Sequence, residues 1–149
     1  MATAPRRART IGSRSAAALV AMAAALLLAA CSEQQIELLD RINATRAENG
    51  LTELYAHPAA MSKAQAWAET MATEGVLRHS DLSEGITGDW RRIGENVGFS
   101  SDIATVHQAF LDSAPHRANI VDAGFTHVGT GYAESADGRI WVVQVFVEY

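Results

Sequence analysis

Four stretches of the chain repeat apolar residues at the spacing of three and four that a helix requires. The first opens with Ser32 and Gln35, which have the form of a capping box. The others cover 58–75, about 101–112, and a short segment that Pro115 opens. We therefore expect four helices, with a core made of Ile36, Leu39, Ile42, Met61, Ala64, Trp67 or Ala68, Met71, Ile103, Val106 and Phe110.

Strand patterns occupy about 126–134 and 139–149, joined by the hairpin signal Asp137-Gly138, and Val97–Phe99 is a shorter candidate. The last strand is apolar on both faces, so both faces must be covered. This predicts an α+β fold, an α/β/α sandwich with a small, mainly antiparallel sheet between helical layers. One face carries Trp141, Val143, Val145 and Val147, and the other carries Ile140, Val142 and Phe146 with Gln144, which needs a polar partner.

The first 30 residues have the composition of a secretory signal peptide: a basic start without acids, then an apolar run over 16–30. That run is shorter than the roughly 20 residues of a spanning helix. It ends in "LAAC", which resembles a bacterial lipobox and makes Cys31, the only cysteine, the expected lipidation site. The alternative is an uncleaved anchor with a buried cysteine, and the choice between Sec and twin-arginine export stays open.

The expected organisation is a lipoprotein signal peptide over 1–30, a lipidated cysteine with a short tether over 31–35, and one domain over 36–149. The chain holds 12 Lys and Arg against 17 Asp and Glu. Four arginines leave with the signal, so the mature chain carries a net charge of −9. Such a surface repels nucleic acid. We expect an extracytoplasmic protein of the bacterial cell envelope, held at the membrane through lipid on Cys31.

Two histidines and a carboxylate stand out. His79 follows an apolar pair, Val76-Leu77, that predicts partial burial, His116 lies on the short helix, and Glu95 sits in the otherwise apolar "RIGENVGFS". Two imidazoles and one carboxylate suffice for an open site for Zn or another divalent metal. The same groups could instead form an acid–base pair or a hydrogen-bonded cluster that orders the core. Spacing alone does not decide, because these positions fit no local ligand pattern.

The other histidines are expected to be ordinary ones. His57 sits at a helix entry and suits a capping or surface role, and His107 suits a solvated position. His127 lies at the start of a strand and is expected to be a surface histidine or one satisfied by its neighbours. Ser80 is adjacent to His79 in sequence, and neighbours rarely align as nucleophile and base.

The ordered motifs His79-Ser80, Gly94-Glu95-Asn96, "HRANI" from His116, "GTGY" from Gly129 and "WVVQVF" from Trp141 resemble the CAP superfamily, in its small bacterial branch. The resemblance runs from about residue 36 to the C-terminus. It implies the same α/β/α sandwich and a cleft with His79, Glu95 and His116, supported by Ser80, Asn96 and Asn119. The family's second cleft glutamate has no counterpart here, and Asp112 is not assumed to replace it.

The resemblance implies no single activity. The first hypothesis is a binding module whose cleft takes a divalent metal, a small apolar ligand or a cell-wall component. A structural or interaction domain at the envelope and a metal-dependent, peptidase-like hydrolase are the alternatives. No residue pattern identifies a substrate, so catalytic residues remain unassigned.

Overall fold

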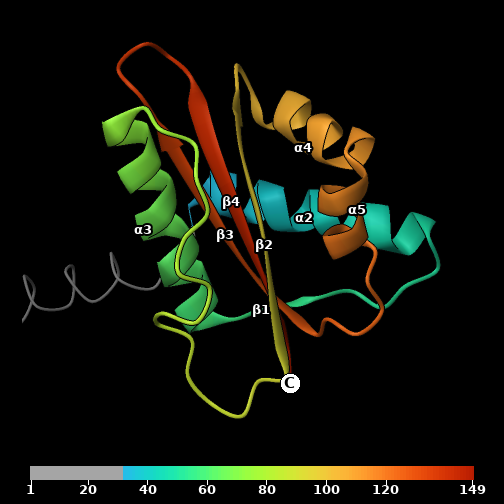
Figure 1. Cartoon of the computed structure of the whole chain (residues 1–149). Coiled ribbons are helices and arrows are strands. Elements are labelled where there is room, and N and C mark those ends of the chain that lie inside the picture. Colours follow the sequence, from blue (N-terminus) through green and yellow to red (C-terminus); the bar gives the residue numbers. More distant parts are fainter. Residues whose placement is uncertain (1–31) are drawn as a thin grey trace, which may run out of the picture. The chain divides into compact units, whose positions relative to one another are not determined.

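The computed structural model describes residues 32–149, so the predicted signal peptide and Cys31 lie outside the described residues (Figure 1). Four strands form one sheet in the order β1-β3-β4-β2, with β1 parallel to β3 and the other pairs antiparallel. The elements along the chain are α2 (Glu33–Glu48), β1 (Tyr55–Ala56), α3 (Pro58–Glu74), β2 (Arg92–Ser100), α4 (Ile103–Asp112), α5 (Ala114–Ile120), β3 (His127–Glu134) and β4 (Ile140–Glu148).

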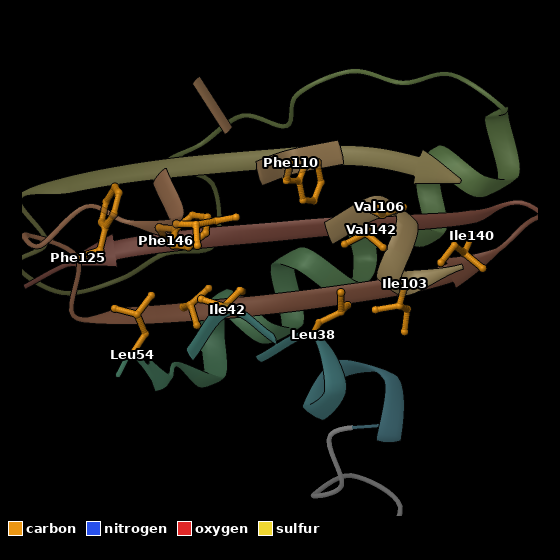
Figure 2. Packing of buried hydrophobic residues seen from close by; sticks show 12 residues of the cluster. Leu38, Ile42, Leu54, Ile103, Val106, Phe110, Phe125, Ile140, Val142 and Phe146 are labelled. Atoms are coloured by element: carbon orange, nitrogen blue, oxygen red, sulfur yellow. The ribbon is translucent and has the colours of Figure 1, made fainter. Parts of the chain in front are cut away.

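Helices cover both faces of the sheet, with α3 on one side and α2, α4 and α5 on the other (Figure 1). The central strand β4 is buried from Ile140 to Val147, as its two-faced pattern predicts. The expected α+β sandwich is confirmed. Figure 2 shows the core on the α2/α4 side, where Leu38, Ile42, Val106 and Phe110 pack toward Val142 and Phe146 of β4.

The helix α3 packs directly on β3 through residues without bulk. A Cβ placed on Gly129 would lie 2.0 Å from the Ala60 carbonyl carbon, and one on Gly131 would lie 2.1 Å from the Ala64 carbonyl oxygen. Both alanines are fully buried. Backbone therefore meets backbone, which explains why "GTGY" carries two glycines two residues apart, on one face of the strand.

Side chains cover the edge of β3 that faces away from β4, because β1 pairs only with the first two residues of β3 along that edge. Gln65 of α3 accepts from the Tyr132 N–H (3.1 Å) and donates to its carbonyl (2.8 Å). Gln35 of α2 donates to the Thr130 carbonyl at 2.8 Å. These amides satisfy backbone groups that would otherwise be open for pairing with another chain.

The local signals for turns and caps are confirmed. Ser32 and Gln35 form the capping box, so α2 begins at Glu33, inside the segment expected as a tether. In the β3–β4 hairpin, Gly138 has a φ of 80° and donates to the Ser135 carbonyl at 2.8 Å. The loop therefore has three residues and ends in a left-handed glycine.

Three expectations about burial and bounds were wrong. Ile36 is 48 % exposed, and α2 buries Leu38 instead. Of the two alternatives expected in α3, Ala68 is buried, as predicted, and Trp67 is half-buried. The strand expected at Val97–Phe99 is longer and covers Arg92–Ser100. Val76 and Leu77, expected to be partly buried, are exposed. Within residues 32–149, no helix is both long and apolar enough to span a bilayer.

Candidate functional site

Glu95 lies in β2 with its side chain only 1 % exposed, and it accepts three hydrogen bonds from one loop. Ser80 donates its backbone N–H to Oε1 (2.9 Å) and its hydroxyl to Oε2 (2.6 Å). The Nδ1 of His79 lies 2.7 Å from Oε1. These bonds replace the water that the buried carboxylate loses, and they hold the loop after α3 against the edge strand.

The hydrogen bond to Glu95 fixes the orientation of the His79 ring. An ionised carboxylate only accepts, so the Nδ1 of His79 must carry the proton that it shares with Oε1. The neutral ring then keeps the lone pair of Nε2 free. Since 59 % of the His79 side chain is exposed, the structure presents an oriented imidazole to solvent.

Asn96 serves the opposite face of β2, because successive strand side chains alternate between faces. Its Nδ2 donates to the carbonyl of His116 and to Oε1 of Gln144, each at 3.0 Å. Asn119 of α5 donates to Asn96 Oδ1 at 2.9 Å. Asn96 thus bridges β2 to α5 and β4, and it is the partner that Gln144 needs, although Gln144 Nε2 has none within residues 32–149.

His116 approaches from this second face and is held through its backbone rather than its ring. The ring packs on Phe110, with centroids 5.1 Å apart. Burial lowers the pKa of His116 below its ordinary value of 6.5, and the charge of His79 lowers it further. The two histidines thus lie beside β2, which is an edge strand of the sheet.

Glycines flank Glu95 where the backbone must come close to its neighbours. A Cβ on Gly94 would lie 2.9 Å from Asn119 Oδ1 and from Phe125 Cζ, and one on Gly98 would lie 2.8 Å from Phe110 Cε1. Both glycines therefore allow a close approach that a side chain would block.

The sequence profile of the cysteine-rich secretory protein (CAP) family matches residues 39–146. The chain belongs to the CAP family. The YkwD protein of Bacillus subtilis is 29 % identical over 122 residues, which are 76 % of this chain and 47 % of YkwD. The CAP domain thus spans about half the length of this relative.

Solved structures show the same fold. An extracellular SCP-domain protein of Bacillus anthracis superposes with a TM-score of 0.69 at 22 % identity, over 78 % of this chain and 40 % of that one. An outer surface protein of Borrelia burgdorferi gives a TM-score of 0.68 at 17 % identity, over 78 % and 93 % of the two chains. At these identities the likeness establishes the fold alone.

The residues of this CAP domain fit the expected three-ligand metal site only in part. In residues 32–149, no three His, Cys, Asp or Glu side chains lie together in a way that could hold a metal ion. Both oxygens of Glu95 are occupied by His79 and Ser80. His79 and His116 retain imidazole nitrogens suited to zinc, whereas Glu95 supports His79 from behind. Asp112 accepts from Gln108 on the exposed surface of α4 and does not join the cluster.

Two other histidines have structural roles: the role of His57 was predicted from the sequence, and the burial of His107 was not. His57 caps α3 by accepting from Ala60 N–H at 3.2 Å, as its position predicts. His107 was expected in solvent but is buried, with its Nε2 3.0 Å from the Thr45 hydroxyl of α2. Burial lowers the pKa of His107. His107 is buried because α2 covers α4 on the side that His107 faces.

Proposed function

We propose that this CAP domain is an extracytoplasmic binding module of the cell envelope, and that its ligand meets the Nε2 of His79 and the ring of His116. One observation carries the proposal: a buried carboxylate fixes an imidazole that is itself 59 % exposed. A histidine that only ordered the core would be buried with its partner. Lipid on Cys31 would keep the module at the membrane surface.

A divalent cation that prefers imidazole, zinc above all, is the ligand best suited to this pair. Glu95 would act as the hydrogen-bonded support that commonly stands behind a metal-bound histidine. Only two protein nitrogens are available, so the remaining positions would belong to water or to a donor group of a cell-envelope molecule. A small apolar or cell-wall ligand that binds without metal is the competing version of the same proposal.

Zinc titration by calorimetry tests the metal version on the full chain. We expect one zinc per chain, with affinity at least about tenfold weaker in His79→Ala and in His116→Ala, since losing even a supporting residue of a metal site costs that much. His127→Ala, which removes a half-buried histidine outside this site, should bind as the unmodified chain does. Unchanged zinc affinity in both His79→Ala and His116→Ala would exclude the metal version.

A second candidate function is structural. Glu95 accepts from the His79 ring and from both the backbone N–H and the hydroxyl of Ser80. Such a set of bonds is expected if the cluster only fixes the loop after α3. Function would then lie in surface contacts of the domain at the envelope. The stability of Glu95→Gln, treated in the Discussion, measures how much of the cluster's role is structural.

A further inference from the structure

A second feature, separate from the His79 site, involves a buried cation. Arg46 of α2 is 1 % exposed, and its guanidinium donates only to carbonyl groups: Nε to Thr52 (2.8 Å) and Nη1 to Ile120 (3.0 Å) and Asp122 (2.8 Å). The carboxylate of Asp122 accepts from Nη1 and Nη2 of Arg92, at 2.6 and 2.8 Å. Among residues 32–149, the positive charge of Arg46 therefore has neutral acceptors but no carboxylate in contact.

An uncompensated buried charge is costly, so the surroundings of Arg46 need an explanation. Burial lowers the pKa of the guanidinium, and the charge of Asp122 offsets only part of that effect. An anion placed beside Arg46 would supply the missing charge.

A hollow of about 310 Å³ lies beside this guanidinium. Arg46 Nη2 donates to no residue in 32–149. In this range, the fully buried side-chain atoms without a hydrogen-bond partner are His107 Nδ1 and Gln144 Nε2, so Nη2 is not fully buried. Nη2 is thus the nitrogen of Arg46 with hydrogen-bonding capacity left for a molecule in the hollow. The lining consists of Arg46, Gly50, Leu51, Thr52, Glu53, Tyr55, Ala123, Phe125 and Thr126, none of which belongs to the His79 site.

We propose that this hollow binds a small organic monocarboxylate, whose carboxylate accepts from Arg46 Nη2 and whose apolar part lies against Phe125 and Tyr55. Guanidinium and carboxylate form the stronger, charge-assisted class of hydrogen bond. Phe125 is 3 % exposed and Tyr55 is 69 % exposed, so the apolar wall extends from the core to the surface. The exposed carboxylate of Glu53 at the rim disfavours a second negative charge on the ligand.

Calorimetry with phenylacetate and its neutral analogue phenylacetamide tests the charge requirement on the full chain. The two probes share a shape and differ in the charge at the acceptor. We expect phenylacetate to bind at least about tenfold more tightly than phenylacetamide. A hydrogen bond to a charged acceptor is stronger than one to a neutral acceptor, and a single such bond is enough to change the affinity about tenfold. Binding should weaken with added salt.

Two variants test the location without touching the hydrogen bonds of Arg46. Ala123→Trp, at an exposed lining position, should fill the hollow and abolish phenylacetate binding, while Glu53→Gln should strengthen it by removing a like charge. Equal affinity for the two probes, undiminished binding in Ala123→Trp, or no phenylacetate binding at about 10 mM, where even a weak millimolar complex would form, would each overturn the proposal. None of these results depends on His79 or His116.

Discussion

Replacing Gly131 with alanine is expected to destabilise the CAP domain strongly. The new Cβ would lie 2.1 Å from the Ala64 carbonyl oxygen, 2.2 Å from its carbon and 2.6 Å from the Gln65 nitrogen. All three are backbone atoms of α3, so no side chain can rotate away, and the helix itself must move. We expect a loss of at least about 3 kcal/mol, the upper range for overpacking, which is a large share of a typical domain stability.

Gly50→Ala is the matched control for this substitution. No atom lies within 4 Å of a Cβ at Gly50, and its φ of 71° is the sole source of strain. That strain costs roughly 1–2 kcal/mol, so urea denaturation should show Gly131→Ala to be the more destabilised variant. Equal stability of the two variants would contradict the direct contact between α3 and β3.

Replacing Glu95 with glutamine is expected to destabilise the domain by about 2 kcal/mol, because hydrogen bonds to a buried charged acceptor are lost. A glutamine keeps one acceptor oxygen but presents an NH₂ group to donors on Ser80 and His79. The loop after α3 should loosen as a result. Faster hydrogen exchange of the Ser80 amide, which donates to Oε1, would report this directly.

Glu69→Gln provides the control, since Glu69 lies on the exposed surface of α3 and its change should stay within about 0.5 kcal/mol. If Glu95→Gln matches this control in urea and in Ser80 exchange, the carboxylate does not fix the loop. That outcome would remove the structural candidate function and leave His79 without its support.

Much of the fold follows from the sequence because strand alternation and turn chemistry are local. The two-faced pattern of β4 predicts a covered sheet, and Asp137-Gly138 predicts the hairpin. The phase of α2 was wrong because its buried stripe includes polar residues, Gln35 and Thr45, which bond to other elements. A hydrophobicity pattern cannot mark such positions, since their burial depends on partners far away in the chain.

In the candidate site, too, the sequence does not show contacts that depend on partners far away in the chain. The motif resemblance places Ser80 and His79 near Glu95, and the distances agree. Strand alternation could have shown that Glu95 and Asn96 face opposite sides of β2. It could not show that His116 is tied to Asn96 by its carbonyl, because that contact depends on how α5 docks.

The orientation of His79 by Glu95 is tested most directly by finding which ring nitrogen of His79 carries the proton. ¹⁵N NMR of the full chain can show this at a pH above the range where histidine titrates. The hydrogen bond to Glu95 predicts that the proton is on Nδ1 and that Nε2 carries the free lone pair. This state should switch or become mixed in Glu95→Gln. A ring protonated on Nε2 in the unmodified chain would contradict the claim that Glu95 orients His79 toward a ligand.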